Sequence, residues 1–257
     1  MTISATEPAR SGQDNGRFFM VSAIVMVLVT IAGFVVQLAA GRSSFSSPLL
    51  VHAHAIIFMG WLVIYVLQNY FATSGRTDLH RKLGWIAVGW LVAMVVLGLL
   101  VAVAMVQRGQ TPFFFRPLHF LIFDPAMLFT VVGLTVTAIS LHHKTEWHPR
   151  LQFTAMAILT VPGIGRLLPS PLLMPWAWEL SLITAAVFPI VGALFDLRRD
   201  GRIHPAWGAG IGVIVALIFA VNAITFSPAG AAIYRTVTAG TQGAAIAPLA
   251  FPSPPPH

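Results

Sequence analysis

The chain contains no cysteine among its 257 residues. This absence excludes disulfide bonds, iron–sulfur clusters held by thiolates, and a cysteine nucleophile. Charged residues are also scarce, at 9% of the chain, whereas hydrophobic residues make up 57%. A typical soluble domain has about a quarter charged residues and about half apolar residues. The composition therefore excludes an ordinary soluble domain and indicates an integral membrane protein.

Several motifs of soluble enzymes are absent as well. The sequence has no Gly-rich phosphate loop, no nucleophile elbow and no zinc-protease helix. The formal net charge is +7, but the basic residues lie in short clusters between apolar runs. Such clusters are typical of topology signals and of contact with lipid headgroups. We therefore expect the lipid bilayer as a partner and no nucleic acid.

Apolar runs of about 20 residues, the length that crosses a bilayer, fill most of the chain. The runs are Phe18–Ala40, Leu49–Ala72, Leu83–Val106, Leu118–Leu141, Leu151–Leu168, Trp176–Leu197 and Ala206–Phe226. The fifth run is the shortest. The pattern predicts an all-α membrane protein with a seven-helix bundle over residues 17–226. Residues 1–16 are polar and residues 227–257 are rich in Gly, Ala and Pro, so both are predicted to be disordered.

Lysine and arginine are more frequent on the side of the N-terminus than on the other side of the predicted bundle. The richer side of an inner-membrane protein faces the cytoplasm. The sequence therefore predicts a multi-pass protein of the bacterial inner membrane. Its N-terminal segment is predicted to be cytoplasmic and its C-terminal tail periplasmic.

A weaker pattern suggests that the first span is followed by three helical hairpins. The second, fourth and sixth spans each follow a proline, and the loop after each of them carries a histidine near the start of the next span. The residues concerned are Pro48, Pro117 and Pro175, and His80, His148 and His204. The alternative is that short cytoplasmic loops are generally basic and often contain proline.

Ionisable residues within spans are costly to bury and indicate functional sites. Asp124 lies about 9 Å from the start of its span, which begins at the outer side of the membrane. Arg166 lies about 22 Å from the start of its own span, which begins at the cytoplasmic side. These depths agree to within one turn, so we predict that Arg166 pairs with Asp124 or Glu179 and that these three residues are catalytic candidates. The alternative is a proline kink at Pro162, with Arg166 extending to the interface.

Histidine is the natural ligand for a transition metal or haem iron in a chain without cysteine. His52 and His54 are about 200° apart on a helix, so both cannot face one metal. We predict that one of them, together with His119 and with Asp124 or Glu179, binds a metal ion or a cofactor. Histidines that only anchor helix ends at the interface are the alternative.

The cytoplasmic face carries a second set of histidines, His80, His148 and His204. With the outer histidines they form two layers, as in transmembrane cytochromes that stack two haems. The neighbouring basic residues oppose binding of a bare metal ion and favour anions.

The motifs resemble those of a group of bacterial seven-helix inner-membrane proteins. The resemblance rests on an HxH motif, an LHRxLG motif, an HxRL motif and an RxHP motif, and it covers residues 17–210. The motifs stand here at His52–His54, Leu79–Gly84, His148–Leu151 and Arg202–Pro205. The resemblance implies a seven-helix topology and supports the choice of these motif residues, and it implies no activity.

The leading functional hypothesis is a histidine-dependent haem or metal protein that acts in oxidoreduction or electron transfer. The second hypothesis is a small proton-coupled transporter without a cofactor, in which Asp124, Glu179 and Arg166 form a relay. The third is a membrane enzyme that uses Asp124 and Glu179 as an acid/base pair on a lipid-like substrate. A small hydrophobic or anionic substrate fits the last two, and the sequence does not specify the oligomeric state.

Overall fold

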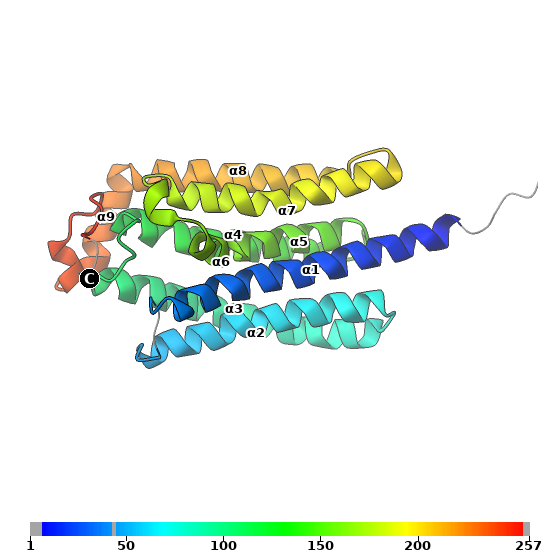
Figure 1. Ribbon diagram of the computed structural model, residues 1–257, viewed down its shortest axis with the longest axis horizontal. Helices are drawn as coiled ribbons and strands as arrows, with labels where there is room; N and C mark the ends of the chain where they lie inside the picture. Colours follow the sequence, from blue (N-terminus) through cyan, green and yellow to red (C-terminus); the bar gives the residue numbers. More distant parts are fainter. Residues whose placement is uncertain (1–6, 43–44, 254–257) are drawn as a thin grey trace, which may run out of the picture.

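The computed structural model describes residues 7–42 and 45–253, which are helical with no strand among them. Most helices run side by side along the long axis of the molecule (Figure 1). The elements are α1 (Glu7–Ala39), α2 (Leu49–Thr73), α3 (Thr77–Gln107), α4 (Pro117–Ser140), α5 (Trp147–Leu159), α6 (Val161–Leu167), η1 (Ser170–Leu173), α7 (Ala177–Asp200), α8 (Pro205–Thr225), α9 (Pro228–Thr238) and η2 (Gln242–Ala245).

Six of these helices are long and apolar enough to cross a membrane, namely α1, α2, α3, α4, α7 and α8. Many large apolar side chains on their outer faces are exposed, which suits contact with lipid and not with water. The chain is therefore a multi-pass membrane protein. We call the end where α1 begins and where the α2–α3, α4–α5 and α7–α8 loops lie the basic end, and the other the α9 end (Figure 1).

The predicted fifth span is the one that differs. It is divided at Thr160 into α5, with 13 residues, and α6, with 7 residues, and neither is long enough to be a span by itself. Pro162 has no N–H group to donate within the helix, which explains a break next to it. Gly163 and Gly165 would permit local unwinding, but the structure keeps both in α6. The predicted count of seven spans thus stays a prediction at this segment.

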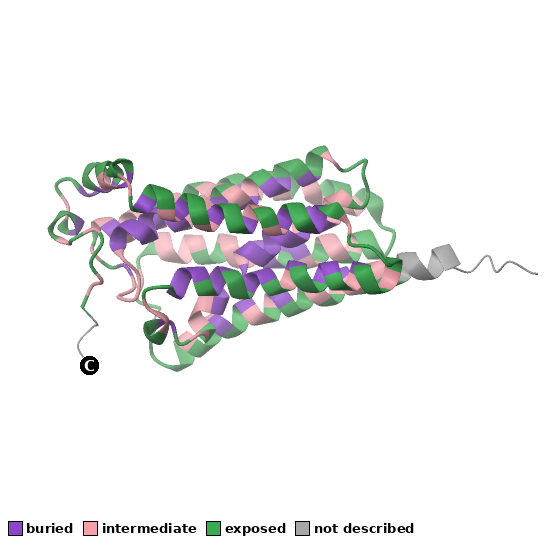
Figure 2. Cartoon of the chain, turned by 90° about the horizontal axis from the view of Figure 1, so that it is seen from above, coloured by how far each residue is buried: buried purple, intermediate pink, exposed green. Residues whose placement is uncertain are grey.

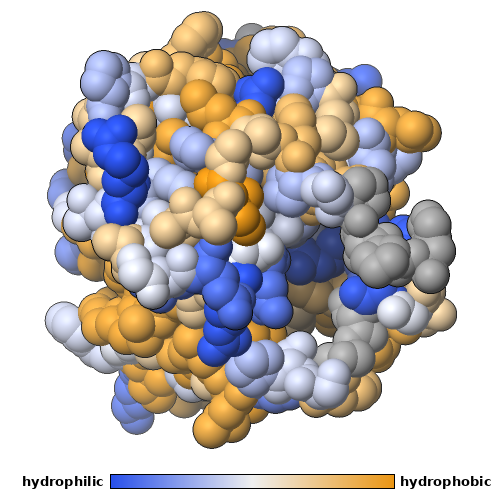
Figure 3. Space-filling view, turned by 90° about the vertical axis from the view of Figure 1, so that its left-hand side faces the viewer, coloured by the Kyte–Doolittle hydropathy of each residue, from blue (hydrophilic) through white to orange (hydrophobic). Residues whose placement is uncertain are grey.

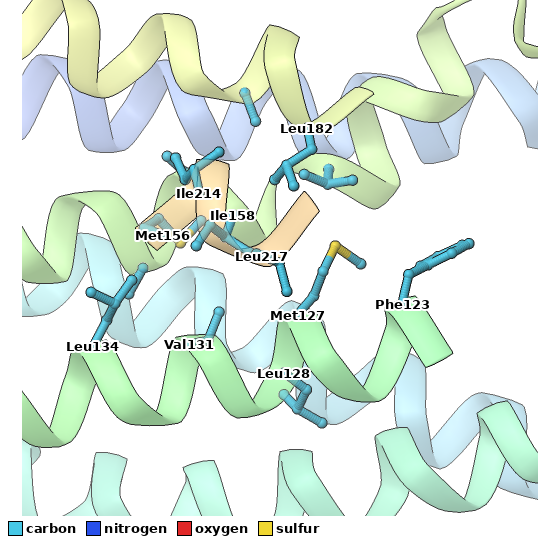
Figure 4. Packing of buried hydrophobic residues seen from close by; sticks show 14 of the residues in the cluster. Phe123, Met127, Leu128, Val131, Leu134, Met156, Ile158, Leu182, Ile214 and Leu217 are labelled. Atoms are coloured by element: carbon cyan, nitrogen blue, oxygen red, sulfur yellow. The ribbon is translucent and has the colours of Figure 1, made fainter. Parts of the chain in front are cut away.

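The core lies where α4, α5, α7 and α8 meet, and buried residues concentrate along this centre (Figure 2). Figure 4 shows Met127 and Val131 of α4 next to Ile158 of α5, with Ile214 and Leu217 of α8 closing the same cluster. Helix α5 is buried on almost every side, because other helices surround it. Any polar side chain on α5 must therefore find its partners within the protein.

Close contact between α1 and α6 depends on two glycines. A Cβ atom on Gly33 would lie 2.1 Å from the backbone oxygen of Gly163, and a Cβ on Gly163 would lie 2.6 Å from the Cα of Thr30. By contrast, Gly208 and Gly212 of α8 have no such neighbour within 4 Å of an added Cβ. The sequence suggests that these two pack against another helix, and within the described chain that interpretation is wrong.

The C-terminal segment differs from its predicted disorder over the described residues. Helix α9 begins at Ser227–Pro228, where the Ser227 hydroxyl accepts a hydrogen bond from the Gly230 N–H at 3.2 Å. Tyr234 is buried and donates to the Gly243 carbonyl at 3.0 Å, which fixes η2 against α9. The surface at this end mixes hydrophilic and hydrophobic residues (Figure 3).

The N-terminal segment also differs in part from its prediction. Helix α1 begins at Glu7, so residues 7–16 of the predicted disordered segment are helical. Residues 1–6 lie outside the described part, as do residues 254–257 at the other terminus.

Candidate functional site

A buried polar cluster lies at the α9 end and joins three helices. His119 of α4 and Glu179 of α7 are both buried, and their Nε2 and Oε1 atoms are 4.0 Å apart. The amide of Asn222 on α8 donates to the same Glu179 oxygen at 3.2 Å. The rings of Trp178 and Phe123 pack around the imidazole, with centroids at 5.3 and 5.6 Å. The structure thus brings two of the predicted site residues together, His119 and Glu179.

Several polar atoms at this end are buried and have no hydrogen-bond partner among the described residues. These atoms are Thr111 Oγ1, His119 Nε2, Trp178 Nε1, Glu179 Oε2 and Thr225 Oγ1. Buried polar atoms normally have a partner, so such a group requires an explanation. The imidazole nitrogen of His119 and the second carboxylate oxygen of Glu179 thus have unused hydrogen-bonding capacity in a buried place.

Arg166 and Asp124 do not form the predicted ion pair. No nitrogen of Arg166 lies within 4.0 Å of a carboxylate oxygen of Asp124 or Glu179. The guanidinium donates instead to the Pro162 carbonyl at 2.8 Å and lies 4.2 Å from the ring centre of Phe34. Its charge still acts on Asp124 at longer range. The predicted pairing of Arg166 with Asp124 or Glu179 is therefore wrong.

His52 and His54 lie in different surroundings, as their 200° separation on α2 requires. His54 stacks on Phe58 with ring centroids 4.1 Å apart, and the positive charge of Arg166 acts on its imidazole electrostatically. His52 hydrogen-bonds the Phe45 carbonyl at 3.1 Å in the α1–α2 loop. Neither ring contacts His119 among the ring pairs of the described residues. The three outer histidines, His52, His54 and His119, therefore do not come together at one site.

A second buried polar site, at the basic end, was not recognised in the sequence. Arg150 of α5 and Asp196 of α7 form a two-pronged ion pair, with Nε–Oδ2 at 2.8 Å and Nη2–Oδ1 at 2.9 Å. Each is only 1% exposed. The indole of Trp207 on α8 donates to Asp196 Oδ2 at 2.7 Å, and Arg150 Nη1 donates to the Glu146 carbonyl at 2.8 Å. This network joins α5, α7 and α8.

His80 and His148 lie close together beside this network. His80 is in the first turn of α3 and His148 is in the first turn of α5, and their ring centroids are 6.1 Å apart. His148 Nδ1 donates to the Ala138 carbonyl at 2.8 Å, so its Nε2 keeps a free lone pair. His80 Nδ1 lies 3.2 Å from the backbone carbonyl of Gln68, to which it can donate, and 2.7 Å from the position in which the Gln68 side-chain amide nitrogen would donate to it. When Nδ1 donates to the carbonyl, Nε2 of His80 carries a lone pair, as Nε2 of His148 does. Neither Nε2 atom has a hydrogen-bond partner among the described residues.

His204 has a different role at the same end. Its Nδ1 accepts a hydrogen bond from the Ala206 N–H at 3.1 Å and so caps the start of α8. Its Nε2 lies 3.3 Å from Glu146. Burial lowers the pKa of His204, and the charge of Arg150 lowers it further. A neutral imidazole is what the cap requires, because a protonated Nδ1 could not accept a hydrogen bond.

The described residues contain no group of three or more His, Cys, Asp or Glu side chains arranged to hold a metal ion. A zinc ion bound by the protein alone would need three or four such ligands. Comparison with protein-family models, with curated proteins and with solved structures finds no match. The buried polar groups at the two ends of the bundle are therefore the features that bear on function.

Proposed function

We propose that this protein is a membrane-embedded electron-transfer protein in which His80 and His148 provide the two axial ligands of a haem iron. The observation that carries the proposal is the 6.1 Å separation of the two imidazole rings. Two imidazoles that share one iron, with N–metal bonds of about 2 Å each, have ring centres about 6 Å apart. Haem needs only two protein ligands, because the porphyrin supplies the others.

The surroundings of the pair also suit haem ligation. A ligating histidine usually donates its other ring nitrogen to a carbonyl, which fixes the ring, and His148 does so to Ala138. Arg76 and Lys144 in the adjoining loops carry positive charge that haem propionates require. The haem would supply one-electron redox chemistry. His80 and His148 would both hold the group from the protein side, so the site would suit electron transfer rather than binding of a substrate to the iron.

Absorbance of the purified protein tests this function. Protein titrated with haemin should show a Soret band that saturates at about one haem per chain. His80→Ala and His148→Ala should each remove the band, and His148→Met should keep it with a raised reduction potential, because methionine is also an axial ligand. His143→Ala, which changes a histidine of the same loop, is the matched control and should leave the spectrum unchanged.

Two outcomes contradict the proposal. One is a folded, monodisperse protein that stays colourless after the titration, and the other is a band that persists in the His80→Ala, His148→Ala double variant. A colourless folded protein would favour the second candidate, a proton-coupled carrier. The unpartnered buried atoms of His119 and Glu179 are the observation that supports that candidate.

We also propose that the chain lies in the bacterial inner membrane with the basic end in the cytoplasm. That end holds Arg76 and Lys144 in its loops and Arg81 and Lys82 near the start of α3, which favours retention on the cytoplasmic side. A reporter fused near residue 144 should therefore read cytoplasmic, and one fused after residue 257 should read periplasmic. A cytoplasmic signal from the second fusion would mean that the fifth segment does not cross the membrane.

A further inference from the structure

A cleft of about 710 Å³ opens at the basic end between α1 and α7. Its rim carries Arg17 of α1 and both Arg198 and Arg199 of α7, against a single acidic residue, Asp14. Arg17 and Arg198 have no hydrogen bond or ion pair among the described residues. Arg199 is already paired through Nε and Nη2 with Asp200, and only its buried Nη1 atom lacks a partner. The rim therefore has two unpaired guanidinium groups, Arg17 and Arg198, and these favour an anion.

The deeper part of the cleft is apolar. Phe18 of α1 stacks on Phe195 of α7 with ring centroids 4.2 Å apart, and Val21 and Val191 continue the wall. Val21 follows Arg17 by about one turn, or about 6 Å along the helix, and Val191 lies about 10 Å from Arg198. Charge at the rim and an apolar wall one to two turns further into the bundle match the headgroup and the acyl chain of an amphiphile.

We infer that this cleft binds an anionic phospholipid, with the phosphate at the arginine rim and an acyl chain along Phe18, Val21 and Val191. Arginine suits this role because its planar guanidinium donates two parallel hydrogen bonds to a phosphate. The site is distinct from the proposed haem ligands on α3 and α5, and the inference does not depend on them. A free phosphate would satisfy the rim but not the apolar wall, which is why we assign a lipid.

Native mass spectrometry of the full chain in detergent tests the assignment. Titration with dioleoyl phosphatidylglycerol should give one retained lipid at concentrations where dioleoyl phosphatidylcholine is not retained. The Arg17→Gln, Arg198→Gln double variant should bind phosphatidylglycerol about tenfold more weakly or worse. Val191→Trp, which fills the apolar wall without changing charge, should also weaken binding. Neither variant alters Arg199, whose side chain also pairs with Asp196.

The matched control removes two basic residues elsewhere at the same end. Arg81→Gln, Lys82→Gln changes a smaller pocket of about 300 Å³ on α3 and should alter the affinity by less than about twofold. Equal losses in the control and in the cleft variant would overturn the inference, since they would indicate only general attraction to basic residues. Inorganic phosphate that displaces the lipid at equal concentration, or an unchanged affinity of the cleft variant, would overturn it too.

Discussion

Replacing Arg150 with methionine is expected to lower the free energy of unfolding by about 3–5 kcal/mol, because it leaves the buried carboxylate of Asp196 without its main partner. The pair is 1% exposed on both sides and makes two hydrogen bonds, at 2.8 and 2.9 Å. Trp207 would still donate to Asp196, and Arg199 Nη2 would stay 3.9 Å from Asp196 Oδ1. Neither replaces the two short hydrogen bonds from the Arg150 guanidinium, so the buried carboxylate loses most of its compensation. Unfolding in detergent micelles with increasing SDS would measure the loss.

A double-mutant cycle separates the pair from general disruption of the core. The Arg150→Met, Asp196→Leu protein should recover much of the loss, because an apolar pair of similar volume replaces a buried ion pair at little cost. Arg198→Met, two residues from Asp196 but exposed, is the control and should change stability by less than about 0.5 kcal/mol. If the Arg150→Met protein were as stable as the Arg198→Met control, the ion pair would not contribute to the packing of α5 against α7.

The same pair connects stability to the proposed function. His148 lies two residues before Arg150 in the first turn of α5, so the ion pair to α7 fixes the position of the imidazole. Arg150 does not itself reach the ring, and we regard it as a positioning residue. Arg150 also donates from Nη1 to the Glu146 carbonyl, which fixes the end of the α4–α5 loop just before His148.

Much of the helical fold could be predicted because apolar runs end at charged or proline-containing loops. The predicted second span, Leu49–Ala72, differs by one residue from α2, and the start of the fourth differs by one residue from α4. The kink at Pro162, which the sequence offered as an alternative, corresponds to the division of the fifth segment at Thr160. Helix ends are local properties of the chain, so a single sequence carries them.

Pairing between distant residues could not be predicted in the same way. Arg150 and Asp196 are 46 residues apart, and each stands near the end of an apolar run, where a charge is usually interfacial. Depth along a helix suggested that Arg166, Asp124 and Glu179 share one layer. The depth of a residue does not show which neighbouring helix its side chain faces. In the structure Glu179 faces His119 and not Arg166.

The structured C-terminal segment was missed for a different reason. Its composition, averaged over residues 227–257, is that of a disordered chain. The local signal was present, since Ser227–Pro228 combines a capping residue with a proline at the first helical position. Tyr234 then supplies a large buried side chain that packs into the core cluster, and Gln107 of α3 donates to the Val237 carbonyl at 2.9 Å, so that the segment is held to the bundle.

Replacing Gly33 with alanine is the second change with a large expected effect, a loss of roughly 3 kcal/mol in the free energy of unfolding. The new Cβ would lie 2.1 Å from the Gly163 carbonyl oxygen, which is a backbone atom and cannot rotate away. Helix α1 would have to separate from α6 along their crossing. In lipid this separation is costly, because helices associate there mainly through close van der Waals contact.

Gly212→Ala is the matched control and should change stability in the opposite direction. Nothing lies within 4 Å of the Cβ that it would add, so alanine gains the usual preference over glycine in a helix, about 0.5–1 kcal/mol. The same micelle unfolding assay compares the two variants directly. If both variants were stabilised, the contact between α1 and α6 would have to be looser than the structure shows. If both were destabilised, Gly212 would have to pack against a surface outside the described chain, since no described residue approaches it.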